Sequence, residues 1–276
     1  MLARGHRCGG AGARARTSTT PSAAWARGIL PSLRRRGGAK ATGWFARAVH
    51  DAPYFLLFVV TPTLSRRLLT IAEVIAVVAI FAGWFIYCSV RAVMAGFPVP
   101  RFEDGGMVLL VAFEACTFSV AALILYLRGW KLRDFNLRAS WGGCLVGSLL
   151  YGASVLACFA IWDLFRSDAS AQALLVEMSG AARVSLPVAL LVSAVNGAFE
   201  EFFLTGYLLK ALEGAGASMA IGTSGLIRLL YHLYQGPLGA CSALAFGLII
   251  ALFYWRYRQL WPAVVAHFLA DLIAFA

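Results

Sequence analysis

The chain has 276 residues, of which 61% are hydrophobic and only 13% are charged, and its mean hydropathy is +0.76. A soluble globular domain carries about 25% charged residues, so the composition excludes that class and indicates a protein that crosses a membrane several times. The formal net charge of +11 is concentrated in residues 1–50, which contain ten Arg and Lys residues and no Asp or Glu.

The first segment, residues 1–53, is rich in Ala, Gly, Ser and Thr as well as in Arg. It holds too little apolar surface to fold, so we expect a disordered, basic tail in the cytoplasm, attracted to anionic lipid headgroups. An Arg-rich, acid-free start is also typical of an organellar transit peptide, and the Ala, Arg and Gly bias also fits an upstream start codon in a GC-rich bacterial gene. A solvated tail accounts for these charges, and no nucleic-acid partner is predicted.

A membrane-spanning helix needs about 20 mostly apolar residues. A shorter apolar patch, Tyr54–Val60, ends at Thr61-Pro62 and is predicted to be interfacial or re-entrant. The predicted fold is therefore all-α: a polytopic transmembrane helical bundle of about seven spans, or eight if this patch belongs to a full span. We expect residues 54–184 to form the N-terminal transmembrane helices and residues 185–276 the catalytic core. The seven predicted spans are Leu69–Val90, Met107–Leu127, Trp141–Trp162, Leu186–Leu208, Ala217–Tyr234, Leu238–Trp255 and Leu260–Ala276.

Loop charges predict the orientation, because cytoplasmic loops collect Lys and Arg. Basic loops alternate with mixed or acidic loops through the seven spans, so the basic loops all fall on one side of the membrane. This places the N-terminus inside and the C-terminus outside. We therefore expect an integral protein of a bacterial cytoplasmic (inner) membrane, with the lipid bilayer as its first partner. The basic side holds Arg66, Arg67, Arg128, Lys131, Arg133, Arg138, Arg256 and Arg258.

Five titratable residues lie within the last apolar segments: Glu200, Glu201, His232, His267 and Asp271. A carboxylate in hydrocarbon costs at least ~2.5 kcal/mol, so a charged group inside a membrane indicates a functional site. His267 and Asp271 are four residues apart, so both can reach one ligand, water or metal. These groups together predict a catalytic or ligand-binding centre inside the membrane.

Helix geometry assigns different surroundings to the two glutamates, because neighbours in sequence point about 100° apart. Ser193, Asn196 and Glu200 form a polar stripe on one helix face, whereas Glu201 shares its face with Thr205. We therefore expect Glu200 and Glu201 to have different roles.

Three motifs carry a resemblance to a known family: FEEFFLTGYL, RLLYHLYQG and LWPAVVAHFLAD. They resemble the EExxxR, FxxxH and HxxxN/D signatures of the CPBP family, also called the Abi family, of intramembrane proteases, whose relatives include the CAAX prenyl endopeptidases. The resemblance covers roughly residues 185–275, and the preceding loop RGWKLRDFNLRASW is similar to the family's entry into its third span. It implies that Glu200 activates a water, that His232 assists it, and that His267 with Asp271 binds the oxyanion or a metal.

Peptide hydrolysis needs a nucleophilic water, a base and donors to the tetrahedral oxyanion. A glutamate in a dry cavity suits the role of base, and His and carboxylate ligands with an open position are also what catalytic zinc uses. The HExxH motif of ordinary zinc proteases is absent. Two mechanisms therefore stay open: metal-independent catalysis, which we favour, and a site with one zinc or similar divalent ion bound by Glu200, His232, His267 and Asp271.

The chain departs from the family pattern at two positions. Thr205 stands where the family has Arg, and Arg228 stands where it has Phe. We interpret these departures as one event, in which Arg228 supplies the lost cation, pairs with Glu201 and leaves Glu200 free for chemistry. The predicted catalytic set is Glu200, Glu201, His232, His267 and Asp271, with Arg228, Asn196 and Thr205 in support.

Three functions are compatible with these residues. The leading one is an intramembrane endopeptidase that cuts a peptide or a lipidated protein at or within the membrane. The second is a noncatalytic relative, such as a bacteriocin-immunity or partner-binding protein, which Thr205 favours. The third is a proton-coupled transporter, against which the absence of an internal repeat weighs.

Overall fold

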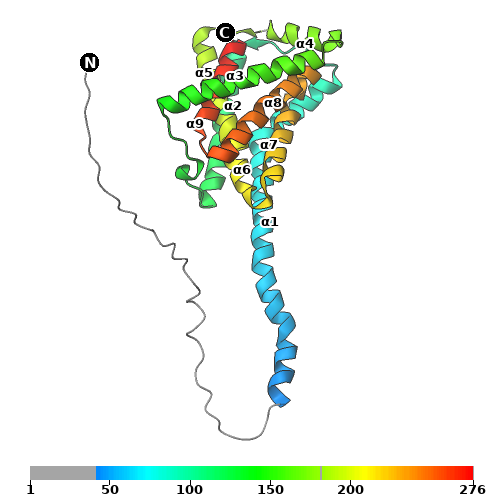
Figure 1. The fold of residues 1–276 in the computed structure, drawn as a ribbon, viewed down its shortest axis with the longest axis vertical. Coiled ribbons are helices and arrows are strands. Elements are labelled where there is room, and N and C mark those ends of the chain that lie inside the picture. The colour runs from blue at the N-terminus through cyan, green and yellow to red at the C-terminus, as the bar shows by residue number, and fades with distance from the viewer. Residues whose placement is uncertain (1–41, 181, 276) are drawn as a thin grey trace, which may run out of the picture. The chain divides into compact units, whose positions relative to one another are not determined.

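The computed structural model describes residues 42–180 and 182–275. Within them the chain is built almost entirely of helices, which confirms the all-α prediction (Figure 1). The helices are α1 (Thr42–Met94), α2 (Asp104–Leu127), α3 (Trp141–Leu164), α4 (Ala169–Ser179), α5 (Leu186–Glu200), α6 (Leu208–Ala211), α7 (Ala217–His232), α8 (Gly236–Tyr257) and α9 (Trp261–Phe275). A π-helix, η2 (Glu201–Tyr207), joins α5 to α6, and short 3-10 turns lie at η1 (Leu132–Phe135), η3 (Glu213–Ala215) and η4 (Leu233–Gln235).

Helix α1 begins within the segment that was predicted as a tail. Residues 42–53 and the patch Tyr54–Val60 belong to α1. Residues 1–41, to which most of the predicted basic tail belongs, lie outside the described part.

Two compact units divide the chain, one up to Leu57 and the other from Phe58 onward. The described part of the first unit, residues 42–57, is helical. The second unit contains all the other elements. The predicted division near residue 184, between N-terminal helices and a catalytic core, stays a prediction.

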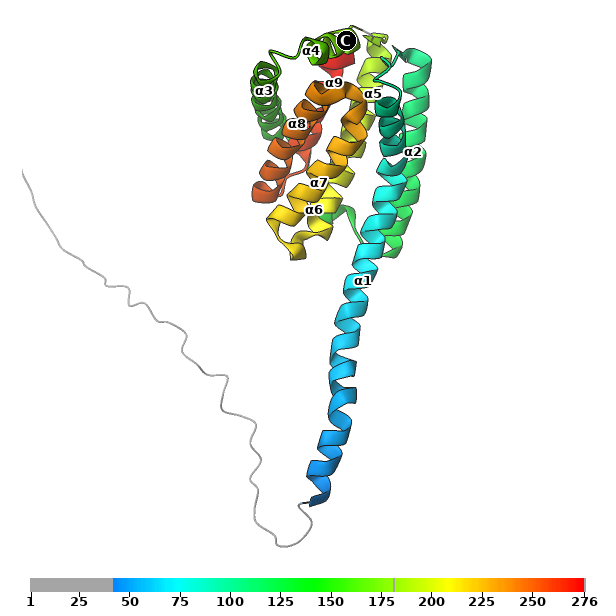
Figure 2. The ribbon, with the colours of Figure 1, turned by 90° about the vertical axis from the view of Figure 1, so that its right-hand side faces the viewer.

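Each of the seven predicted spans falls on a helix, but five segments are long and apolar enough to cross a membrane. Those segments are Leu68–Met94, Asp104–Leu127, Trp141–Leu164, Leu186–Ala211 and Ala217–Tyr257, and the last of them contains both α7 and α8. Helix α9 is apolar but shorter. Helices α7 and α8 are separate because η4 and Gly236, with φ of +74°, turn the chain between them (Figure 2).

Helix α9 packs between α5 and α3, and two glycines allow this close approach. A Cβ atom on Gly197 of α5 would lie 3.0 Å from the backbone nitrogen of Phe268, and one on Gly147 of α3 would lie 2.7 Å from the carbonyl oxygen of Pro262. Helix α3 also packs against α8 (Figure 1). Backbone contact at these two glycines brings the polar residues of α9 next to those of α5.

Strands β1 (Phe102–Glu103) and β2 (Ala182–Arg183) pair in parallel just before α2 and α5. The backbone nitrogen of Ser185 also donates a hydrogen bond to Asp104, at 2.7 Å. Because the two strands are parallel, α2 and α5 start at the same end of the bundle and run in the same direction.

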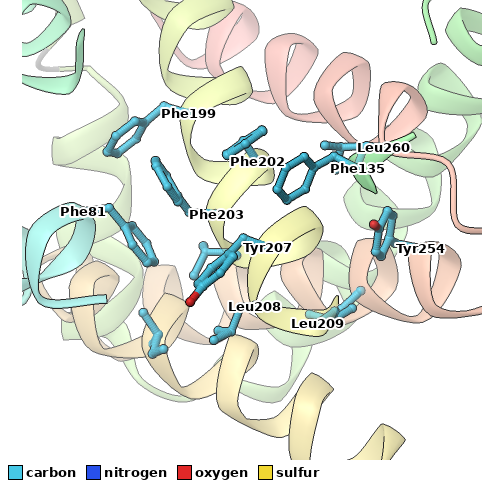
Figure 3. Close-up of a cluster of buried hydrophobic side chains, with 14 of the residues drawn as sticks. Phe81, Phe135, Phe199, Phe202, Phe203, Tyr207, Leu208, Leu209, Tyr254 and Leu260 are labelled. Atoms are coloured by element: carbon cyan, nitrogen blue, oxygen red, sulfur yellow. The ribbon is translucent and has the colours of Figure 1, made fainter. Parts of the chain in front are cut away.

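An aromatic cluster fills the core beside η2 (Figure 3). Phe81 of α1 stacks on Phe203 with ring centroids 4.9 Å apart, and Phe135 packs on Phe202 at 4.4 Å. Tyr207 is fully buried in the same cluster. Within a membrane such rings stabilise the bundle through close van der Waals packing, so the cluster fixes the segment that carries the two glutamates.

Candidate active site

The two glutamates lie at the junction of an α-helix and a π-helix. Glu200 is the last residue of α5, and Glu201 is the first residue of η2. Short π-helical segments are rare and occur frequently at functional sites. Glu200 and Glu201 share Arg228 as a partner, but Tyr231 donates only to Glu200 and Thr205 only to Glu201.

Glu201 is fully buried and is held by three side chains. Arg228 of α7 approaches it with Nη2 2.6 Å from Oε1, and His267 of α9 with Nδ1 2.7 Å from the same oxygen. The hydroxyl of Thr205 donates to its Oε2 at 2.5 Å. A carboxylate with this many donors is committed to structure, and we assign Glu201 the role of a positioning residue.

Arg228 of α7 is the cation that contacts Glu201. It is only 2% exposed, and its contact with Glu201 is the ion pair predicted from the exchange with Thr205. Gly247 of α8 makes room for it, since a Cβ atom there would lie 2.4 Å from Cδ of Arg228. The ring of Phe246 lies 5.5 Å from the guanidinium carbon, a cation–π distance.

Glu200 is less free than predicted. Its Oε2 accepts a hydrogen bond from the Tyr231 hydroxyl and lies 3.3 Å from Nη1 of Arg228. The correction has a simple cause, because the forked guanidinium can reach two carboxylates at once. Oε1 of Glu200 makes no hydrogen bond with any other residue that the structure describes, so this oxygen is available to a water.

Glu200 borders a cavity of about 330 Å³. Four other polar site residues line the same cavity: Asn196, Tyr231, His232 and Asp271. The remaining walls are apolar or aromatic and include Phe85, Phe102, Met107, Leu110, Leu175 and Phe275. An apolar cavity with a few convergent polar groups is the usual form of a ligand or active site.

His232 ends α7, and its Nδ1 lies 3.0 Å from the carbonyl oxygen of Arg228. Because a carbonyl only accepts, Nδ1 carries the proton in this contact. The other ring nitrogen, Nε2, is then an acceptor for a water in the cavity.

Asp271 and Asn196 also line the cavity. The amide nitrogen of Asn196 donates to Asp271 at 2.8 Å, which leaves its second N–H for another acceptor. Nε2 of His267 lies 3.6 Å from Asp271 and 3.7 Å from Glu200. His267 thus lies between the two acids, although it does not line the cavity.

The donor set does not fit a metal ion in this arrangement. Among the described residues, no group of three or more His, Cys, Asp or Glu side chains is placed to hold one. The Arg228 guanidinium contacts both Glu200 and Glu201, so a positive charge already occupies the side of the site where a cation would need these oxygens. Metal binding by Glu200, His232, His267 and Asp271, the alternative that the sequence left open, stays a prediction, and the chemistry that we propose for this chain uses its own side chains.

Two further acids lie outside this group. Glu73 of α1 is bound by Arg128 at 2.7 Å, and Trp130 and Tyr207 donate to it. Glu114 of α2 lies elsewhere in the core. It is 1% exposed, and neither of its carboxylate oxygens has a hydrogen-bond partner in the described part of the chain.

All eight sequence-predicted site residues therefore lie in one connected group, while Tyr231 was not predicted. A signal for it was present within RLLYHLYQG, since Tyr231 lies three residues after Arg228 and so shares its helix face.

Comparison with known proteins gives one family. Residues 182–273 match the family model described as type II CAAX prenyl endopeptidase Rce1-like. This stretch of the chain is therefore similar to an Rce1-like domain. Searches of curated proteins and of solved structures return no match. The matched range contains every residue of the group described above, and it confirms the resemblance to intramembrane proteases that the three motifs indicated.

Proposed function

We propose that this chain is an intramembrane endopeptidase in which Glu200 activates the attacking water. The observation that carries the proposal is the shared cavity, in which a carboxylate with one unbonded oxygen faces a histidine and an amide within an apolar bundle. The Rce1-like domain supports the reaction class, since its family consists of intramembrane proteases.

The first chemical step uses Glu200 and His232. A water held by Oε1 of Glu200 and Nε2 of His232 gives its proton to Glu200 while its oxygen attacks the peptide carbonyl. The free N–H of Asn196 is the donor that we assign to the resulting oxyanion. Breakdown of the tetrahedral intermediate then returns the proton from Glu200 to the leaving amine, so that protons balance over the cycle.

The surrounding residues hold these groups in place. Tyr231 and Arg228 fix the orientation of Glu200, and Asp271 fixes the amide of Asn196. Glu201 anchors Arg228 and His267. Thr205 gave the main argument for a noncatalytic relative, and this argument is weaker now that Arg228 supplies the cation.

The test compares membrane proteomes of cells that express the wild type or Glu200→Gln. We expect peptide termini that depend on the wild type to disappear in the variant. Glu213→Gln, an exposed acid-to-amide change in the same chain, is the matched control and should keep them. If no terminus differs between the wild type and Glu200→Gln at equal protein levels, the proposal fails.

A further inference from the structure

The cavity lies toward one end of the bundle. Besides the polar site residues, it is bordered by Phe102 at the start of α2, by Tyr234 and Gln235 in the turn after α7, and by Phe275 at the end of α9. We call this the cavity end. The segments that connect the long helices there are residues 95–103, 165–180, 182–185 and 233–236. Glu200 lies fourteen residues after Leu186, or about 21 Å along the helix from this end.

The opposite end is closed beneath the site. There, Phe203, Tyr207 and Leu260 have no exposed surface, and Phe135 and Phe202 are at most 7% exposed (Figure 3). These side chains pack without space for a peptide on the far side of the glutamates. A substrate therefore reaches Glu200 from the cavity end.

The two ends differ in charge. The closed end has nine basic and three acidic residues: Arg66, Arg67, Arg128, Lys131, Arg133, Arg138, Lys210, Arg256 and Arg258 against Glu73, Asp134 and Glu213. The cavity end has four basic and five acidic residues: Arg91, Arg101, Arg166 and Arg183 against Glu103, Asp104, Asp163, Asp168 and Glu177. Lys and Arg collect on the cytoplasmic side of membrane proteins, so the closed end is the cytoplasmic one.

We infer that the cavity opens on the extracytoplasmic face and takes the juxtamembrane segment of a membrane-anchored protein exposed on that face. The inference rests on the proposed endopeptidase function. A segment tethered in the same bilayer reaches the buried glutamate at a high effective concentration, and apolar walls at Met107, Leu110 and Leu175 suit the apolar side chains next to a membrane anchor. A cytoplasmic chain terminus would have to cross the aromatic layer that closes the other end.

The orientation is tested with single cysteines in the full-length chain, after replacing its native cysteines with Ser. Glu103→Cys reports the cavity end, Gln235→Cys reports the cavity, and Arg138→Cys is the control at the closed end. In spheroplasts treated with a membrane-impermeant maleimide, we expect labelling of the first two variants and none of the third until the cells are lysed. The reverse pattern, or equal labelling of all three before lysis, would overturn the inference.

A second measurement covers the case in which the cysteine-free chain does not fold. Alkaline phosphatase fused after Ala276 in the otherwise native chain should be active, and green fluorescent protein at the same place should be dark. Fluorescence from the second fusion would contradict the orientation.

The substrate claim is tested by the location of the termini that depend on Glu200. Termini in extracytoplasmic juxtamembrane segments support the inference. Termini in cytoplasmic segments would overturn it while the proposed function stands, and the absence of any dependent terminus would instead refute the proposed function.

Discussion

Replacing Glu201, the buried partner of Arg228, with Gln should destabilise the protein far more than replacing Glu213, the exposed partner of Arg258, with Gln. The chain offers two arginine–glutamate pairs with the same Nη2–Oε1 distance of 2.6 Å: Arg228 with Glu201, and Arg258 with Glu213. The glutamate side chain is 0% exposed in the first pair and 52% exposed in the second. Glu201→Gln and Glu213→Gln are therefore a matched pair of substitutions.

The expected magnitudes follow from burial. Breaking a buried pair from one side costs about 3–5 kcal/mol, because the other charge stays buried and unpaired. An exposed pair is worth about 0–1 kcal/mol. For a chain of this size, 1 kcal/mol changes the unfolding temperature by about 2–4 °C. We expect Glu201→Gln to lower Tm by roughly 6–20 °C and Glu213→Gln to lower it by about 4 °C at most.

The assay is thermal unfolding of the purified, detergent-solubilised variants, followed by tryptophan fluorescence. Trp130 is a suitable reporter because its ring contacts Tyr207 of the π-helix, with centroids 5.2 Å apart. Equal Tm changes in the two variants would refute the reasoning that the Arg228–Glu201 pair holds the site together.

Three further predictions concern the same site. Arg228→Phe alone should abolish cleavage or folding, and adding Thr205→Arg should restore much of it by returning the family's usual arrangement; equal damage in the single and double variants would show that the two departures are unrelated. Tyr231→Phe should lower kcat by about tenfold or more with little change in KM, because a hydrogen bond to a charged group is worth ~1.5–3 kcal/mol; an unchanged kcat would remove Tyr231 from the orientation of Glu200. A strong chelator should leave the activity of the purified protein unchanged, and loss of activity that an added divalent ion restores would contradict the metal-free arrangement.

The sequence predicted the helices well because long apolar stretches in a membrane have few alternatives to a helix. It also predicted that the site residues meet, since carboxylates and histidines in apolar segments must find polar partners or water. The pairing of Arg228 with Glu201 could be predicted because the motifs lack an Arg at Thr205 and contain an extra one at Arg228, so the total charge of the motifs is unchanged.

The remaining features depend on contacts between distant parts of the chain. The partners of Glu73, for example, are Arg128, Trp130 and Tyr207, which are 55 or more residues away in the sequence. The π-helix after Glu200 has no signature in the residues themselves. The second contact of Arg228, with Glu200, depends on how closely α7 packs beside η2, which no spacing within one helix determines.

The most direct test of the central claim is cleavage by the purified chain in liposomes, with a substrate found by the comparison of termini. We predict that the wild type cuts it, that Glu200→Gln does not, and that the variant still folds, because the amide keeps the shape of the side chain and Arg228 keeps its pair with Glu201. Cleavage by Glu200→Gln at the wild-type rate would contradict the assignment of Glu200 as the base.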